Sequence, residues 1–416
     1  MARQGRTYAM KQLPLKGIRV LDLTMMWAGP YATKMLGEMG ADVIKIESAG
    51  AWDNVRTLFP STDQVDDPWN ANYYFSEYNH EKRSVTLDLR REAGRQAFLR
   101  LARNSDVVID NYRADVMDKL GLSPEVLLET NPRLVIVSMA AFGKHGADSN
   151  LVGFGPIFEM MSGLTSLSGY DSDTPQRSGV SYGDPIGGLT AVGAVTLSLL
   201  NRERTGSGSV IDLSQNEACA AMAGAAFAAY AASGFVETPT GNRNRAWAPE
   251  GCYPARGDDQ WIVLSCTNDA EWAVCAALTG HADLGVLTLE ERRTRHDEID
   301  ELIAAWSSRI DPRVAVEALQ AAGVPAGRVL DMRTIKDDPH LYARGFWIRV
   351  PNEKMRPYRK HGVVWRFREA NPTIARHAPY FGADNREVLS SVGGMTPAEI
   401  DQLEADGVIS VDLGSR

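Results

Sequence analysis

The chain has 416 residues, of which 44% are hydrophobic, so it is long enough for two domains and can bury a sizeable core. Its formal net charge of −9 argues against a broad nucleic-acid partner, although local basic patches can still hold phosphates. The four cysteines, Cys219, Cys252, Cys266 and Cys275, lack C-x-x-C spacing, so the sequence predicts reduced thiols in the cytoplasm rather than a disulfide framework or a zinc site.

The first fifty residues predict a βαβ unit, with strands at 17–24 and 42–47 and a helix at 31–39. Such a unit indicates a parallel sheet with a right-handed crossover. It also resembles the start of a dinucleotide site. The loop after the first strand reads M-M-W-A-G-P, however, and Trp27 and Pro30 would keep a pyrophosphate away from the backbone. NAD binding is therefore rejected.

The β–α alternation continues along the N-terminal half of the chain. Residues 49–80 lack periodicity and are predicted to form a long loop of the kind that usually has a function. Further strands are predicted at 84–89, 106–110, 133–139 and 209–213, with a helix from Arg90 and Arg91 to about Arg103 and another at 124–129. This order predicts an α/β fold with a doubly wound parallel sheet.

Four cationic side chains follow successive strands of the predicted sheet, namely Arg90, Arg113, Lys119 and Lys144. Ligands of doubly wound sheets bind at the carboxyl ends of the strands. The cationic rim therefore favours a phosphorylated ligand, although each of these side chains taken singly is equally consistent with a solvated surface residue.

The stretch 179–200 opens with turn residues and continues as an apolar helix. Asp184 directly precedes Pro185, a pattern that predicts a helix with Asp184 as its N-cap. Two interpretations follow. Asp184 is either only a cap, which the local pattern by itself favours, or a nucleophilic carboxylate that the helix dipole keeps ionised beside free N–H groups.

The C-terminal half has a different pattern. Residues 214–232 predict one Ala-rich helix, which is shorter than a membrane span, and the N-terminus has no apolar signal-peptide segment. Residues 236–250 predict a linker or an active-site loop. The remaining predictions are a smaller α+β domain from Cys252 to about residue 330 with a strand at 261–265, strands at 346–350 and 362–366, and a helix at 396–406.

An ordered set of motifs extends over nearly the whole chain. They read L-K-G-I-R-V-L-D-L-T, W-A-G-P, G-A-D-V-I-K-I-E, N-H-E-K-R-S-V-T-L-D-L, D-V-V-I-D-N-Y, N-P-R-L-V-I-V-S and G-V-P-A-G-R-V followed by D-P-H-L-Y-A-R-G-F-W. Together they resemble family III CoA transferases, the group of formyl-CoA transferase, carnitine CoA-transferase and α-methylacyl-CoA racemase. The resemblance implies a Rossmann-like large domain, a smaller inserted α+β domain and a homodimer of two interlocked chains.

The resemblance also implies a division of the chain. Residues 1–215 would form the N-terminal part of the large domain, and 216–250 a connecting helix and a linker or lid. Residues 251–330 would form the small domain, and 331–416 a return linker and the C-terminal part of the large domain.

The substrates implied by the resemblance are an acyl-CoA donor and a carboxylic acid acceptor, with coenzyme A as the cofactor and no metal, nucleic acid or membrane partner. The nucleophilic aspartate of the family falls on Asp184. Its contacts to CoA fall on Trp27, Ala28, Leu87, Arg90, Asn111, Tyr112, Arg113 and Lys119. Formyl-CoA transferase has glutamine at the position of Trp27 and arginine at that of Lys119, so a polar contact to the substrate and a bidentate phosphate contact are expected to be lost.

Two positions separate transfer from racemisation. A racemase of this family would need a histidine where Phe154 stands and a glutamate where Asn268 stands, because exchange of an α-proton needs two acid/base groups. A slipped alignment would offer Glu159 or Asp269 instead. The predicted function is therefore CoA transfer through aspartyl anhydride and aspartyl-CoA thioester intermediates.

Two other functions stay open, an acyl-CoA racemase or epimerase and a CoA-binding relative without catalytic activity. Glu250 is interpreted as solvated rather than as a lid carboxylate. The sequence does not identify the donor or the acceptor acid.

Overall fold

The computed structural model describes residues 12–59, 65–170 and 174–413, so the N-terminal residues used for the signal-peptide prediction lie mostly outside the described part. Contacts divide the chain into two compact units. Unit 1 contains the described residues up to Leu164, together with Ser178–Phe235 and everything from Ala343 onward. Unit 2 contains Thr165–Arg177 and Val236–Tyr342.

Unit 1 is built on a six-stranded parallel sheet with the strand order β3-β2-β1-β4-β5-β6. The strands are β1 (Arg19–Asp22), β2 (Asp42–Glu47), β3 (Lys82–Thr86), β4 (Val107–Asp110), β5 (Val135–Ser138) and β6 (Ser209–Asp212). This is the order of a doubly wound nucleotide-binding sheet, so the α/β prediction is confirmed. The order reverses between β1 and β4, and such a reversal leaves a crevice at the carboxyl ends of the two strands.

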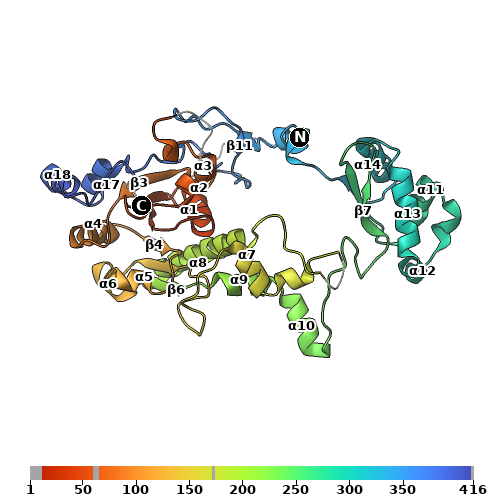
Figure 1. The fold of residues 1–416 in the computed structure, drawn as a ribbon, viewed down its shortest axis with the longest axis horizontal. Coiled ribbons are helices and arrows are strands. Elements are labelled where there is room, and N and C mark those ends of the chain that lie inside the picture. Colours follow the sequence, from red (N-terminus) through yellow and green to blue (C-terminus); the bar gives the residue numbers. More distant parts are fainter. Residues whose placement is uncertain (1–11, 60–64, 171–173, 414–416) are drawn as a thin grey trace, which may run out of the picture. The chain divides into compact units, whose positions relative to one another are not determined.

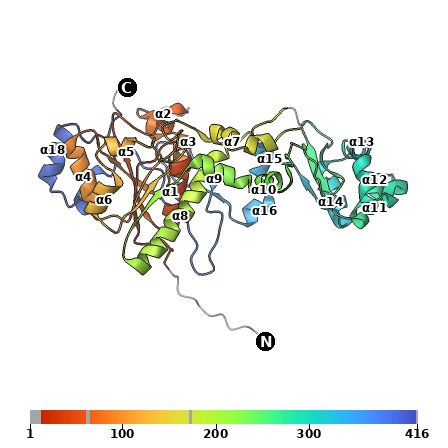
Figure 2. The same ribbon diagram turned by 90° about the horizontal axis from the view of Figure 1, so that it is seen from below.

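Helices cover both faces of this sheet. On one face lie α4 (Glu92–Arg103), α6 (Pro124–Thr130), α17 (Asn385–Ser391) and α18 (Pro397–Ala405), with α4, α17 and α18 grouped together in Figure 1. On the other face α1 (Ala28–Glu38) and α8 (Gly183–Thr205) lie side by side (Figure 2). Strands buried on both faces are apolar along most of their length, as in the V-V-I of β4.

Unit 2 is an α+β unit. Its antiparallel sheet has the strands β7 (Glu250–Pro254), β8 (Trp261–Ser265) and β9 (Ala326–Arg328). Its helices are α11 (Asp269–Leu278), α12 (Leu289–Thr294), α13 (His296–Ser307), α14 (Pro312–Ala321) and the 3-10 helix η3 (Ala282–Val286). Trp272, Ile299 and Leu319 lie in the core that joins these helices to the sheet.

Three predictions of local structure are wrong. The segment 49–80 is not a loop, because it contains α2 (Val55–Leu58), the 3-10 helix η1 (Pro68–Asn70) and α3 (Tyr73–Asn79). A side chain starts α3, since Asn72 Oδ1 accepts the backbone N–H of Phe75 at 2.9 Å. The helix therefore forms from a capped start, although the segment has no apolar periodicity that would predict it.

The predicted helix at 214–232 is two helices, α9 (Gln215–Met222) and α10 (Gly224–Ser233), which are separated at Ala223. The predicted strand at 362–366 is absent, and the ladder there is confined to β10 (Trp347–Ile348) and β11 (Lys360–His361). The remaining short helices are α5 (Val116–Lys119), η2 (Leu164–Leu167), α15 (Met332–Ile335) and α16 (Pro339–Ala343).

Candidate active site

Asp184 is the second residue of α8, and the N-cap of that helix is Tyr182. The prediction that Asp184 caps the helix is therefore wrong, and no side chain caps α8. The Asp184 carboxylate instead accepts hydrogen bonds from groups outside the helix. One of them is the Ser181 hydroxyl, which donates to Oδ2 at 2.9 Å.

The other donors are backbone N–H groups from two further helix starts. The carboxylate accepts from the N–H of Ala28, the first residue of α1, and from that of Gly155, the first residue of α7 (Gly155–Met161). The beginnings of α1, α7 and α8 therefore meet at one carboxylate. The N–H groups of a first helical turn have no partner within their helix, which makes them good donors to an anion.

Two glycines permit this close meeting. A Cβ at position 155 would lie 2.1 Å from Oδ2 of Asp184, and one at position 183 would lie 2.5 Å from the carbonyl oxygen of Gly155. Only glycine allows the starts of α7 and α8 to approach so closely. Sequence reasoning missed Gly155, although the G-F-G-P run before a helix was the available signal.

The pKa of Asp184 is raised to about 6, because burial and then the nearby charge of Glu159 outweigh the hydrogen bonds from Ser181, Ala28 and Gly155, which lower it. Desolvation therefore outweighs the donors that were expected to keep Asp184 ionised. At neutral pH the carboxylate is still mainly ionised. Its pKa lies close to the pH at which it would have to act as a nucleophile.

Glu159, on α7, is the second carboxylate of this site and is 4% exposed. Its Oε2 accepts the Ser178 hydroxyl at 3.0 Å, and its Oε1 has no hydrogen-bond partner among the described residues. The charge of Glu159 contributes to the raised pKa of Asp184, and a carboxyl with a perturbed pKa in a cavity is a candidate for the reacting group.

Two cavities lie in the crevice at the carboxyl ends of the strands of unit 1. The first has a volume of about 190 Å³, and its lining includes Ala28, Asn111, Tyr112, Arg113, Phe154 and Asp184. The second has a volume of about 160 Å³, and its lining includes Ser48, Leu87, Arg90 and Tyr112. Met25 and Tyr112 line both cavities, so the two adjoin. Six of the eight predicted CoA contacts therefore line this pair of cavities.

The cations of the predicted rim differ in their partners. Lys119 lines neither cavity, and its ammonium contacts Asp115 at 2.5 Å, while Arg113 contacts the same carboxylate at 2.8 Å. Lys144 lies 3.7 Å from Asp118. The Arg90 guanidinium makes no hydrogen bond or ion pair within the part of the chain that the structure describes, so it is the cation most available to an added phosphate.

The Asn111 amide is engaged with the protein itself. Its Nδ2 donates to the carbonyl oxygen of Met25 at 2.8 Å, and its Oδ1 accepts the Met25 N–H at 2.8 Å. The side chain thus clamps the loop between β1 and α1. A contact to CoA from Asn111 stays a prediction.

Aromatic side chains from α3 pack against the start of α1. Trp27 lies against Tyr74 and Tyr78, with ring centroids 6.4 and 5.4 Å away. Burial and then the charge of Asp184 raise the pKa of Tyr74 to about 12, which places these rings beside the carboxylate. The Trp27 Nε1 is buried and has no hydrogen-bond partner among the described residues. Sequence reasoning missed both tyrosines, because their helix was predicted to be loop.

The positions that a racemase would need offer no second base. Phe154 lines the cavity of Asp184 but cannot titrate. In unit 2, Asn268 caps α11 by accepting the N–H of Glu271 at 2.9 Å, and Asp269 pairs with Arg292 at 2.7 Å. Glu250 accepts hydrogen bonds from Trp247 and Ser265, so the interpretation of Glu250 as merely solvated is wrong.

Comparisons with known proteins agree with these features. The family model described as CoA-transferase family III matches residues 15–385. The chain is 30% identical over 406 residues to a succinyl-CoA–D-citramalate CoA-transferase of Chloroflexus aurantiacus, covering 95% of this chain and 98% of that protein. It is 32% identical over 341 residues to an acetyl-CoA:oxalate CoA-transferase of Acetobacter aceti, covering 81% and 86%. A crystal structure of a CAIB/BAIF family protein from Brucella suis, 29% identical, matches with a TM-score of 0.84 over 92% of this chain and 100% of that one.

Proposed function

The chain belongs to CoA-transferase family III and is an acyl-CoA:carboxylate CoA-transferase, and on that premise we propose that Asp184 is its nucleophile. The observation that carries this proposal is the meeting of three helix starts at the Asp184 carboxylate, on the wall of a cavity at the carboxyl ends of the strands. The absence of a titratable group at Phe154 favours transfer over racemisation.

In the proposed reaction, an Asp184 oxygen attacks the carbonyl carbon of the donor acyl-CoA. The C–O bond forms, the C–S bond breaks, and CoA leaves as a thiolate, which gives an acyl-aspartyl anhydride. The thiolate then attacks the aspartyl carbonyl of the anhydride and releases the donor acid as a carboxylate. Asp184 is left as a thioester of CoA.

The acceptor acid repeats these steps in reverse. Its carboxylate attacks the aspartyl-CoA carbonyl and forms a second anhydride with release of thiolate. The thiolate attacks the acyl carbon of that anhydride, which gives the new acyl-CoA and restores the Asp184 carboxylate. No net proton is consumed. Once the Asp184 charge moves onto a carbonyl oxygen, the N–H groups of Ala28 and Gly155 and the Ser181 hydroxyl are donors that can stabilise an oxyanion.

Incubation of the protein with a panel of acyl-CoA thioesters in deuterated water, with and without free acids, tests this function by mass spectrometry. Transfer gives new thioesters only when an acid is present. Deuterium at the α-carbon without an acid would instead identify a racemase. Neither product across the panel would contradict both activities for the thioesters used.

The pH dependence of transfer follows from the Asp184 carboxylate. We expect kcat/KM to rise with pH through about 6 and to level off above pH 7, because only the ionised form attacks. The substitution Glu159→Gln removes a negative charge that raises the pKa of Asp184, so the midpoint should move to lower pH. A midpoint that stays in place in this variant would show that Glu159 does not influence the nucleophile. Glu387→Gln, on the far helix α17, is a control that should leave the midpoint unchanged.

We propose that Trp27 contacts the acyl part of the substrate through its indole N–H, which is buried without a protein partner in the described ranges. The substitution Trp27→Phe keeps an aromatic ring against Tyr74 and Tyr78 but removes the donor. Loss of one hydrogen bond should lower kcat/KM by roughly 5- to 30-fold, in line with ~1–2 kcal/mol. Kinetics equal to those of the wild type with several acids would exclude this contact.

The remaining predicted contacts extend the proposal to CoA itself. Leu87, Arg90 and Tyr112 line the second cavity, and Arg113 and Lys119 lie on either side of Asp115. We propose that Arg90 binds a CoA phosphate. We also propose that phosphates draw Arg113 and Lys119 away from their shared carboxylate. The location of the protein in the cytoplasm stays a prediction.

We also propose that the active protein is a homodimer. Within the described residues, α8 has the length and the apolar composition of a membrane-spanning helix, which by themselves are weak evidence for one. Some of its apolar residues are buried and others are exposed. Val195 and Leu199 are buried in unit 1, whereas Leu189, Leu197 and Leu200 are exposed, as are Phe227 and Tyr230 on α10. So much exposed apolar surface on two helices of unit 1 favours an interface with a second copy. Light scattering during size-exclusion chromatography would contradict this proposal if it gave the mass of one chain.

A further inference from the structure

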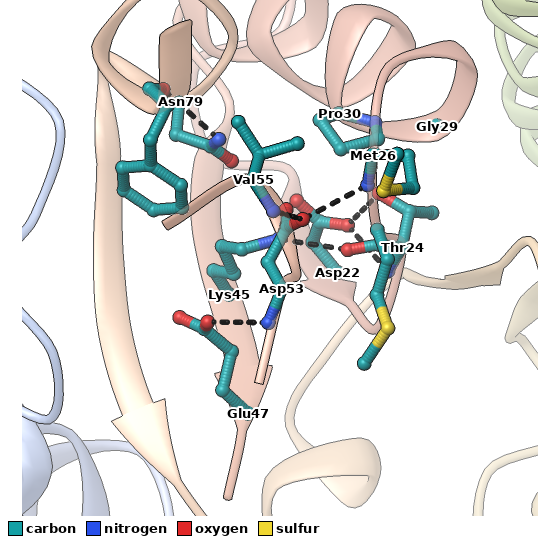
Figure 3. A network of polar contacts seen from close by, with 12 residues as sticks. Asp22, Thr24, Met26, Gly29, Pro30, Lys45, Glu47, Asp53, Val55 and Asn79 are labelled. Carbon is teal, nitrogen blue, oxygen red and sulfur yellow. Dashed lines mark hydrogen bonds and ion pairs between the residues drawn. The ribbon is translucent and has the colours of Figure 1, made fainter. Parts of the chain in front are cut away.

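The loop that presents Ala28 to Asp184 is held by buried side chains beneath it (Figure 3). Thr24 donates its N–H and its hydroxyl to Asp22 Oδ1, at 2.9 and 2.5 Å. Met26 donates its N–H to Asp53 Oδ1 at 3.0 Å. With the Asn111 clamp on Met25, every residue from Thr24 to Met26 is fixed by a side chain from another segment.

Met26 has the most demanding backbone of this loop. Its φ is 70°, in the left-handed region that residues other than glycine rarely adopt, at a cost of ~1 kcal/mol or more. The next residue, Trp27, is the N-cap of α1, and Ala28 is the first residue of that helix. The direction of the Ala28 N–H therefore depends on the conformation at Met26.

Asp53 is itself held firmly. It is 0% exposed, and its Oδ2 lies 3.0 Å from the Lys45 ammonium. Its N–H donates to Glu47 Oε1 at 3.0 Å, and Glu47 in turn pairs with Arg56 at 2.8 Å. The acceptor for Met26 thus sits in a rigid network rather than on a mobile side chain.

Lys45 ties both ends of the loop to this network. Burial opposes its charge, but Asp53, Asp22 and Glu47 together hold its pKa above the ordinary value, so the side chain is an ammonium. It donates to the carbonyl oxygen of Thr24 at 2.7 Å while it pairs with Asp53. One cation therefore fixes the residue where the loop begins and the carboxylate that holds Met26.

We propose that Asp53, held by Lys45, is a positioning residue for catalysis: it keeps Met26 in the left-handed conformation and so directs the Ala28 N–H to the Asp184 carboxylate. This role rests on Asp184 being the nucleophile. It differs from a role in stability alone, because it predicts a change in the reactivity of Asp184 in protein that remains folded.

The direction in which the pKa of Asp184 moves distinguishes loss of the Ala28 hydrogen bond from a simple effect of charge. In Asp53→Asn the Lys45 cation loses its partner, and the added positive field alone would lower the pKa of Asp184. Loss of the Ala28 hydrogen bond would raise it, because that bond favours the ionised carboxylate. Glu159, Tyr74, Tyr78 and Cys219, the other titratable groups that interact with Asp184, are unchanged in this variant.

The experiment compares Asp53→Asn with the double variant Asp53→Asn/Met26→Gly. We expect Asp53→Asn to lower kcat by roughly 10- to 100-fold with a smaller change in KM for the acyl-CoA, and to move the midpoint of the pH profile upward. Glycine adopts positive φ without strain, so Met26→Gly should recover a large part of the lost kcat in this background. Asp384→Asn is the matched control, since Asp384 accepts the N–H of Ser84 at 2.7 Å far from the cavity, and it should leave kcat unchanged.

Three results would overturn the inference: an unchanged kcat in Asp53→Asn, a midpoint that moves downward, or no recovery with Met26→Gly. If Asp53→Asn does not fold, a comparison of Met26→Val with Met26→Ala tests the inference instead. Both residues are shorter than methionine, but only valine strongly disfavours positive φ. The valine variant should have the lower kcat, and equal kcat values would contradict the inference. A fully active Asp184→Ala would instead refute the proposed function itself, so the two failures are distinguishable.

Discussion

Asp184→Asn should lose CoA transfer by ~10⁴-fold or more, because the amide cannot form the anhydride on which both halves of the proposed reaction depend. The variant should stay folded. Burial raises the pKa of Asp184 to about 6, above its ordinary value of 3.8, so the ionised side chain opposes folding at neutral pH. We therefore expect the unfolding temperature of the variant to equal or exceed that of the wild type at pH 7.

The sign of that stability effect can be checked by pH. Because the folded pKa of Asp184 is raised, the wild type gains stability as the pH falls from above 6 to about 4, and the gain levels off below 3.8, where the carboxyl becomes protonated in the unfolded state as well. The difference between Asp184→Asn and the wild type should shrink over this range in thermal unfolding curves. Activity near the wild-type level in a folded Asp184→Asn would end the proposal that Asp184 is the nucleophile.

Mass spectrometry of the intact protein provides a direct view of the same residue. Wild-type protein mixed with an acyl-CoA and quenched in acid should carry a CoA-sized adduct that hydroxylamine removes, and the peptide with Asp184 should contain it. The Asn variant should carry none. An adduct on Glu159 would instead identify that carboxylate as the nucleophile.

Gly155→Ala should lower kcat by roughly 100- to 1000-fold, the effect of losing one well-placed donor and displacing the nucleophile. The added Cβ would lie 2.1 Å from Asp184 Oδ2 and 2.2 Å from Ser181 Oγ, so the carboxylate must move. Affinity for the acyl-CoA should change less than turnover, because Gly155 does not line the cavity formed by Leu87 and Arg90.

Gly179→Ala is the matched control, since a Cβ there would meet nothing within 4 Å, and it lies just before Asp184 in the chain. Its kinetics should equal those of the wild type. Unfolding temperatures of both variants separate a displaced carboxylate from general damage. A Gly155→Ala enzyme with wild-type kcat would mean that the close approach of α7 and α8 is not needed for turnover.

The sheet was the most predictable part of this protein. Each buried strand is a short apolar run bounded by turn residues, and a parallel strand covered on both faces needs that pattern, so β2 at Asp42–Glu47 was predicted to the residue. The helix α3 was not predicted, because its start depends on the Asn72 cap and its rings pack on Trp27, which is far away in the sequence. The resemblance to the family singled out Asp184, but the local pattern alone favoured a simple cap.

By itself, the sequence determined what depends on neighbours along the chain: the alternation of strands and helices, the presence of the apolar helix α8 and the motifs that align with a family of CoA transferases. Only the tertiary structure decided that Asp184 is no cap, that its pKa is raised and that Ala28 and Gly155 donate to it. The physical reason is that strand and helix patterns arise from periodic burial within one segment. The pKa of Asp184 and its hydrogen bonds depend on desolvation and on donors that the fold brings from three separate helix starts.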